Sequence, residues 1–183
     1  MKATAQAPSN IAFVKYWGRK DELLRLPENG SISMNLSTLL TTTTVEFGDF
    51  ELDEVNFNGA IEPLENNRAI KHIDRIRKLT NLNKKVKILT QNNFPTGTGL
   101  SSSASGFAAL TLAGVFAAGL KLSEKELSIL ARQGSGSACR SIPSGFVEWL
   151  DGDSSETSYA VSIFPAEYFE IADVVVVVSA DKK

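Results

Sequence analysis

The sequence has little cysteine, histidine or net charge, and each shortage excludes a class of protein. Its 183 residues contain one Cys and one His, so an internal disulfide is impossible and a structural zinc site with the usual four ligands cannot form from Cys and His. The formal net charge is -2, whereas binding the phosphate backbone of a nucleic acid requires a dense excess of Lys and Arg. We therefore expect no nucleic-acid partner.

Long apolar runs are also absent. No stretch approaches the roughly 20 apolar residues of a membrane-spanning helix, and the first ten residues, MKATAQAPSN, lack the apolar core of a signal peptide. We expect a cytoplasmic protein without a membrane partner. Hydrophobic residues make up 43% and charged residues 22% of the chain, which is the range of ordinary globular proteins.

Hydrophobic periodicity predicts strands and helices in irregular alternation, hence an α+β domain covering residues 1–183. The predicted strands are 31–47, 51–57, 85–90, 145–150, 159–164 and 173–179. The predicted helices are 66–82, 101–118 and a third that opens at the Ser123 and Glu126 capping box and runs toward Gly134. An interruption of the first strand is expected near the threonines at 41–44. The valine run in 173–179 is typical of a central strand covered on both faces.

The segment from Asn93 to Ser105 joins a predicted strand to a predicted helix and is dense in glycine and hydroxyl groups. Glycine lets backbone N–H groups turn inward, the helix N-terminus adds partial positive charge, and serine hydroxyls can reach phosphate oxygens or Mg2+. The loop is neither a Walker A loop, since no Lys follows the glycines, nor a complete dinucleotide-binding fingerprint. It predicts a phosphate site whose cation comes from elsewhere; the alternative is a Ser- and Thr-rich capped turn.

Several other residues have ordinary explanations when taken singly. His72 lies within an amphipathic helical pattern, so we assign it a packed or solvated role and no chemistry. Lys15 and Arg19 could belong to a solvated run of charges, and Tyr16 with Trp17 could be core residues. Only the complete set of motifs favours a functional role for these residues over packing or solvation.

Three motifs occur in an order that is similar to that of a known family. The loop from Pro95 to Ser105, PTGTGLSSSAS, resembles the phosphate-binding motif of the GHMP kinase superfamily. Residues 7–21, APSNIAFVKYWGRKD, and residues 134–141, GSGSACRS, with GFVEW at 145–149, resemble the diphosphomevalonate decarboxylase family. The resemblance covers nearly the whole chain. It implies a GHMP kinase N-terminal ATP-binding domain with a mixed sheet backed by helices.

The resemblance also implies an activity. Enzymes of this family use ATP to phosphorylate the 3-hydroxyl of mevalonate 5-diphosphate, and loss of that phosphate with CO2 yields isopentenyl diphosphate. ATP and Mg2+ are the implied cofactors, the substrate is mevalonate 5-diphosphate or 5-phosphate, and a homodimer is expected for the complete enzyme. The alternatives are a phosphomevalonate decarboxylase, a mevalonate 3-kinase that does not decarboxylate, and a non-catalytic nucleotide-binding half-subunit.

The resemblance assigns roles to particular residues. Lys15 would lie near the reacting hydroxyl and Arg140 would bind the substrate carboxylate, which makes both candidate catalytic residues. The implied substrate-binding residues are Tyr16, Arg19, Ser135 and Ser137. The implied ATP phosphate-binding residues are Pro95, Gly97, Thr98, Gly99, Leu100, Ser101, Ser102 and Ser103, of which Ser102 and Ser103 would also face the metal.

The chain departs from the family pattern at a few positions. Arg19 stands where lysine is common, Gly97-Thr98 replaces a small pair that is often alanine, and Ser144 stands where a second glycine is usual. Because Arg19 belongs to the implied tail-binding region, the diphosphate and monophosphate substrates both stay open. The resemblance also implies a C-terminal domain, absent from this chain, that carries the catalytic aspartate. We therefore expect these 183 residues alone to be inactive.

Overall fold

The structure is a computed structural model that describes residues 1–95 and 99–176. Its strands are β1 (Lys2–Val14), β2 (Arg19–Asp21), β3 (Leu26–Pro27), β4 (Ser31–Gly48), β5 (Glu54–Phe57), β6 (Ala60–Ile61), β7 (Lys85–Asn92), β8 (Phe146–Trp149) and β9 (Ala160–Phe164). Its helices are α1 (Arg68–Thr80), α2 (Ser102–Ala117), α3 (Glu124–Gly134) and the short 3-10 helices η1 (Gly136–Ser141) and η2 (Ala166–Tyr168). Within the described ranges, no helix is long and apolar enough to cross a membrane.

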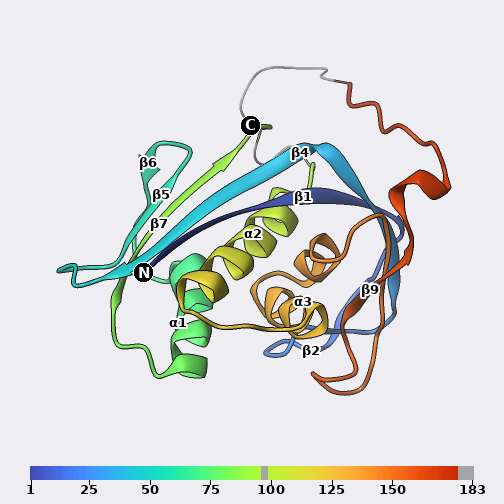
Figure 1. Ribbon diagram of the computed structural model, residues 1–183. Coiled ribbons are helices and arrows are strands. Elements are labelled where there is room, and N and C mark those ends of the chain that lie inside the picture. Colours follow the sequence, from blue (N-terminus) through green and yellow to red (C-terminus); the bar gives the residue numbers. More distant parts are fainter. Residues whose placement is uncertain (96–98, 177–183) are drawn as a thin grey trace.

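The long strand β4 organises the main sheet. It pairs antiparallel with β1 along almost its whole length, with β7 through residues 41–48 and with β8 through residues 31–34. β5 joins β7 in parallel, so the sheet is mixed. The helices α1, α2 and α3 lie together on one side of it (Figure 1). The predicted α+β class, with a mixed sheet backed by helices, is therefore confirmed.

The expected interruption of β4 is present, but it lies before the threonines rather than within them. Thr41 to Thr44 pair continuously with both β1 and β7. The pairing with β1 instead jumps from Pro8 opposite Leu40 to Ser9 opposite Leu36, which leaves three residues of β4 as a bulge. Proline has no N–H to continue the ladder, and bulges bend a strand at such points. The bend allows one strand to serve both parts of the sheet.

The core between the sheet and the helices depends on the small residues of α2. A Cβ at Gly114 would lie only 2.6 Å from Ile76 Cδ1 and 3.1 Å from Ile73 Cδ1, so α1 and α2 are in closer contact than any larger residue would allow. Both isoleucines are fully buried on α1, as their spacing of three predicted. α2 is buried on most sides, since Gly114 and nine other residues of this helix are buried.

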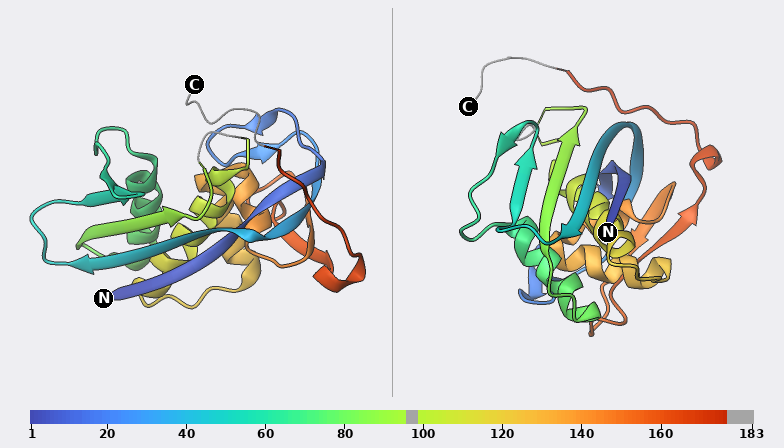
Figure 2. Two further views of the ribbon diagram at one scale, coloured as in Figure 1. Left: turned by 90° about the horizontal axis from the view of Figure 1, so that it is seen from above. Right: turned by 60° about the vertical axis from the view of Figure 1, so that its left-hand side comes forward.

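The prediction of a central strand at residues 173–179 is wrong for its described part. After β9 the chain passes through η2, leaves the edge of the sheet and runs along the outside of the molecule (Figure 2). Val174, Val175 and Val176 are 80%, 47% and 74% exposed and belong to no strand. An apolar run becomes a central strand only where strands are available on both of its sides. Residues 177–179 lie outside the described part of the chain.

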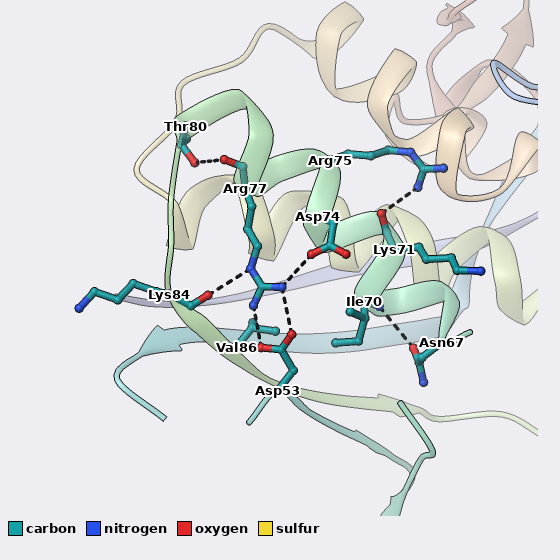
Figure 3. A network of polar contacts seen from close by, with 10 residues as sticks. All are labelled: Asp53, Asn67, Ile70, Lys71, Asp74, Arg75, Arg77, Thr80, Lys84 and Val86. Atoms are coloured by element: carbon teal, nitrogen blue, oxygen red, sulfur yellow. Dashed lines mark hydrogen bonds and ion pairs between the residues drawn. The ribbon is translucent and has the colours of Figure 1, made fainter. Parts of the chain in front are cut away.

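A polar network joins α1 to the start of β5 and β7 (Figure 3). Arg77 makes a bidentate ion pair with Asp53, with Nη2 to Oδ1 at 2.7 Å and Nη1 to Oδ2 at 3.0 Å, and its Nη1 also donates to Asp74. Its Nε donates to the carbonyl oxygen of Lys84 at 3.1 Å, and Asp53 also accepts from the N–H of Val86. One guanidinium therefore fixes the helix against two strands.

Asp53→Asn is expected to lower the free energy of unfolding by about 1–3 kcal/mol at pH 7, because it leaves Arg77 without its less exposed partner. Burial alone would raise the pKa of Asp53, but the hydrogen bonds from Arg77 and Val86 lower it below the ordinary value of 3.8. A lowered folded-state pKa stabilises the protein above about pH 4, and this stabilisation is lost as the pH falls through the folded value. Urea denaturation at several pH values measures it.

The matched control is Asp74→Asn, which removes the other carboxylate of the same network. The side chain of Asp74 is 47% exposed, compared with 14% for Asp53, so we expect a loss below about 1 kcal/mol. Equal losses for the two variants would contradict the proposed difference. So would a loss for Asp53→Asn that does not shrink on acidification.

Candidate functional site

The turn that leads into α2 is shaped by left-handed backbone and anchored to β1. Gly99 has a φ of +85° and Ser101 a φ of +53°. The hydroxyl of Ser9 donates to the carbonyl oxygen of Leu100 at 2.5 Å. Ser101 is the N-cap of α2, yet its side chain makes no capping hydrogen bond. No N-cap side chain therefore covers the first-turn N–H groups, and the positive end of this helix is open to an anion.

A cavity of about 470 Å³ lies beside this helix terminus, between α1, α2, β5 and β7. Its apolar lining comprises Val55, Phe57, Ile88, Phe107 and Leu110, and its polar lining includes Thr43, Glu62, Asn67, Arg68, Thr90, Ser102 and Ser103. By surface area this wall is mainly apolar, and an apolar wall that carries polar groups is typical of a small-molecule site. Ser102 and Ser103 belong to the first turn of α2, so the cavity suits a flat apolar ring with an anionic group directed at that turn.

The candidate phosphate-binding residues fall partly in this region. Gly99, Leu100 and Ser101 form the anchored turn, whereas Gly97 and Thr98 lie outside the described residues and Pro95 ends the first described stretch. Among residues 1–95 and 99–176, no three His, Cys, Asp or Glu side chains cluster as a metal site. Serine hydroxyls fit a Mg2+ that takes most of its ligands from phosphate oxygens and water. The residues present therefore suit a metal that arrives with a phosphate group.

Arg140 of η1 is a buried cation surrounded by neutral groups. It is 2% exposed, and it donates from Nε to Ser33 Oγ at 3.0 Å, from Nη1 to Ser31 Oγ at 2.7 Å and from Nη2 to Asn10 Oδ1 at 3.1 Å. No carboxylate of the described residues forms an ion pair with it. Since buried charges are usually paired, this arrangement is typical of a site for an external anion.

The geometry of Arg140 leaves a place for that anion. A guanidinium has five N–H groups, and the three hydrogen bonds above leave one on each terminal nitrogen. This pair matches the fork with which arginine binds a carboxylate. Burial lowers the pKa of Arg140, with partial compensation from Cys139 and Tyr16, but arginine starts so high that it stays charged at neutral pH.

Lys15 and Tyr16 directly follow the end of β1, and the Tyr16 ring lies close to Arg140. The Tyr16 ring meets Trp149 edge-on, with 4.7 Å between ring centroids, and the guanidinium carbon of Arg140 is 5.9 Å from both rings. Asn29 holds the turn by donating to the carbonyl oxygen of Lys15 at 3.2 Å. Lys15 itself is exposed, and its ammonium group forms no ion pair with a described residue. It is therefore free to meet a ligand.

Arg19 and Lys20 lie on β2 and are both engaged by exposed carboxylates. Arg19 pairs with Glu22 at 2.7 Å and Lys20 with Asp153 at 2.8 Å. These hydrogen bonds are the main reason why the pKa of each cation is raised. Exposed ion pairs contribute little to stability, so an anionic ligand can displace these carboxylates at small cost.

Two of the three motifs, 95–105 and 134–141, meet at a pair of serines that are 32 residues apart in the sequence. Ser135, at the end of α3, is buried and donates from its hydroxyl to Ser103 Oγ at 3.3 Å. Ser137 lies in η1, where its carbonyl oxygen accepts from Asn10 at 3.1 Å. The loop that carries Arg140 is therefore placed directly against the first turn of α2. A ligand beside Arg140 and a ligand at the α2 terminus would be neighbours.

Residues that the sequence reasoning missed hold this arrangement in place. Asn10 bridges Arg140 and the carbonyl oxygen of Ser137, and Ser31 and Ser33 complete the cradle. Asn10 lies within the motif at 7–21, so attention to its polar residues could have found it, whereas the two serines carry no local signal. Burial raises the pKa of Cys139 to about 12, so this thiol stays protonated and is a packing residue.

The fold and the site together define a class. A mixed sheet with helices on one side, and a glycine- and serine-rich turn at the start of a buried helix, form the N-terminal domain of a GHMP kinase fold.

Comparison with known proteins gives the family. The chain belongs to the family described as diphosphomevalonate decarboxylase-like N-terminal domain, which matches residues 7–160. It is 43% identical over 198 residues to the diphosphomevalonate decarboxylase of Candida albicans, covering 99% of this chain and 55% of that protein. The chain spans about half the length of the curated relatives it matches.

Solved structures agree. The crystal structure of mevalonate diphosphate decarboxylase from Staphylococcus aureus is 46% identical, with a TM-score of 0.83, over 87% of this chain and 49% of that chain. The solved complex of MDDEF with MVAPP, AMPPCP and magnesium is 43% identical, with a TM-score of 0.85, over 91% of this chain and 51% of that chain.

Proposed function

We propose that this chain is the nucleotide-binding domain, residues 1–183, of an ATP-dependent mevalonate diphosphate decarboxylase whose second domain supplies the catalytic aspartate. The observation that carries the proposal is the contact between Ser103 and Ser135. It brings the N-terminus of α2, where phosphate would bind, against the loop that carries the buried guanidinium of Arg140. Phosphoryl donor and carboxylate-bearing acceptor would then bind side by side, as phosphoryl transfer requires.

In this proposal the 3-hydroxyl of mevalonate 5-diphosphate receives the terminal phosphoryl group of ATP. The C–O bond to that phosphate then breaks, the bond to the carboxyl carbon supplies the electrons of the new double bond, and CO2, phosphate and isopentenyl diphosphate leave. Mg2+, when bound, would neutralise charge on the ATP phosphates. Ser102 and Ser103 would hold those phosphates with the first-turn N–H groups of α2.

Lys15 would stabilise negative charge, and Arg140 would bind and orient the substrate. The unpaired ammonium of Lys15 would stabilise negative charge on the transferring phosphoryl group. The two remaining N–H groups of Arg140 would hold the substrate carboxylate and orient the C–C bond that breaks. Tyr16, Ser135 and Ser137 would line the substrate, and Arg19 with Lys20 would exchange their carboxylate partners for the anionic tail. This need for a carboxylate site favours the decarboxylase over a kinase that leaves the carboxylate intact.

The test is CO2 release by the protein at its natural length, isolated from its source and supplied with ATP, Mg2+ and carboxyl-labelled mevalonate 5-diphosphate. We expect one CO2 for each ADP formed, and none without ATP. ADP without CO2 would instead establish a kinase, and turnover only with mevalonate 5-phosphate would reassign the tail. The family resemblance leads us to propose that the protein is cytoplasmic and forms a homodimer. The native mass in solution would test the homodimer.

A further inference from the structure

Arg68 lies outside the three motifs, between the cavity and the segment 134–141 that carries Arg140, which we call the substrate loop. It is the first residue of α1 and lines the cavity. Its guanidinium carbon lies 4.9 Å above the ring of Phe107, which lines the same cavity from α2. Its Nη2 donates to the carbonyl oxygen of Gly134 at 3.1 Å. Gly134 is the last residue of α3 and directly precedes Ser135.

The contact at Gly134 is tight. A Cβ added there would lie 2.4 Å from Phe107 Cδ1 and 2.9 Å from His72 Nδ1, so the aromatic ring presses directly on the backbone of the substrate loop. Phe107 therefore contacts both the Arg68 guanidinium and Gly134, which are hydrogen bonded to each other. Packed groups of this kind do not deform continuously, and a shift of one displaces the next.

No carboxylate among the described residues pairs with Arg68. Its only hydrogen bond there is the one to Gly134, so its polar interactions are directed at the end of α3 rather than at an ion pair. The helices α1, α2 and α3 contact one another pairwise and lie together on one side of the sheet (Figure 1). A ring that enters the cavity against Phe107 therefore acts on a residue that also contacts Arg68 and the backbone next to Ser135.

We propose that Arg68 is a positioning residue that couples the cavity to the substrate loop, so that a nucleotide in the cavity and the phosphorylated substrate beside Arg140 each strengthen the binding of the other. The inference rests on the proposed function. Coupling between two binding sites is reciprocal. Arg68 would contribute to it through the stack on Phe107 and the hydrogen bond to Gly134, without touching the reacting atoms.

The test measures the affinity of AMPPCP with Mg2+, in the presence and absence of mevalonate 5-diphosphate, for the natural-length protein and for Arg68→Met. Methionine keeps an unbranched side chain over Phe107 but removes the charge and the hydrogen bond. We expect each ligand alone to bind within about threefold of the wild type, and the factor by which one ligand strengthens the other to fall roughly two- to thirtyfold. Arg68→Lys should restore little, because lysine lacks the planar fork.

The matched control is Arg75→Met, on the same helix. Within the described part of the chain, Arg75 hydrogen bonds only to the carbonyl oxygen of Lys71 in α1 and does not line the cavity, so we expect unchanged coupling. Unchanged coupling in Arg68→Met would overturn the proposal. Loss of AMPPCP binding by Arg68→Met even without substrate would also overturn it, since Arg68 would then be a direct ligand. A wild-type protein that binds neither compound would instead refute the proposed function.

Discussion

Replacing Arg140 with glutamine is expected to lower kcat/KM for decarboxylation by roughly 30-fold to several thousandfold, the equivalent of about 2–5 kcal/mol for losing one partner of a buried charge pair. Glutamine removes the positive charge that the substrate carboxylate would meet. The loss would appear in both KM and kcat if Arg140 holds the carboxylate and also orients the C–C bond. Steady-state kinetics of CO2 release by the natural-length protein measures it.

The same substitution is expected to leave the fold intact. The three partners of Arg140 are two serine hydroxyls and one amide, and the glutamine amide can replace part of these bonds. Removing a buried charge that has no counterion also removes its desolvation cost, so the free energy of unfolding should change by less than about 2 kcal/mol. A melting experiment on the variant therefore separates a lost ligand contact from a lost fold.

Arg132 is the control, because it is also a buried arginine that forms no ion pair with a described residue. It is fully buried and donates to the carbonyl oxygens of Leu24, Ser155 and Ser158. Its bonds join three segments of backbone, so Arg132→Gln should lose about 2 kcal/mol or more of stability through unsatisfied carbonyl groups. If Arg140→Gln behaves like Arg132→Gln, with a large stability loss and little effect on turnover per folded molecule, Arg140 is structural.

The parts of the fold that the sequence predicted well are those whose signal is local. The amphipathic spacing of Ile73 and Ile76, and the Ser123 and Glu126 capping box, depend on residues within one or two turns, and both are confirmed. β1 was missed although it is the main partner of β4, because its sequence KATAQAPSN is rich in alanine and contains Pro8. Alanine is a poor strand former by itself, and only the pairing with β4 makes this segment a strand.

In the candidate site, too, only the features with a local sequence signal could be predicted. The motif that contains Arg140 was recognisable, but its partners Ser31, Ser33 and Asn10 lie 107 to 130 residues away. They reach it only because β1, β4 and η1 converge in the fold. The cavity is likewise assembled from five separate elements, β4, β5, β7, α1 and α2. The valines at 174–176 show the converse case, in which a strong local pattern for a strand finds no neighbouring strands.

His72 is expected to make the protein sensitive to acid. It is fully buried against Phe107, which confirms a packed role. Thr111 uses its one hydroxyl hydrogen on the carbonyl oxygen of Phe107 at 2.6 Å, so His72 Nε2 must donate the hydrogen bond of 2.8 Å to Thr111 Oγ1. The proton therefore lies on Nε2 and the ring is neutral. Nδ1 is buried, faces Gly134 and has no hydrogen-bond partner among the described residues.

Protonating Nδ1 would create a buried cation close to two others. Burial chiefly, and then the charges of Arg75 and Arg25, lower the pKa of His72 to about 3, from an ordinary value of 6.5 that applies in the unfolded chain. Between these values the unfolded state binds a proton that the folded state does not. Stability is therefore complete above about pH 6.5 and falls by up to about 1.4 kcal/mol for each pH unit down to about pH 3.

The full loss amounts to about 4–5 kcal/mol, which is comparable with the whole stability of a marginal domain. Urea denaturation at half-unit steps from pH 7 to pH 5 measures the part that lies above the range where most carboxylates titrate. His72→Gln keeps a donor toward Thr111 but cannot be protonated, so its free energy of unfolding should be nearly flat over this range. Since the chain contains one histidine, equal slopes for the wild type and the variant would show that His72 is accessible to protons in the folded state.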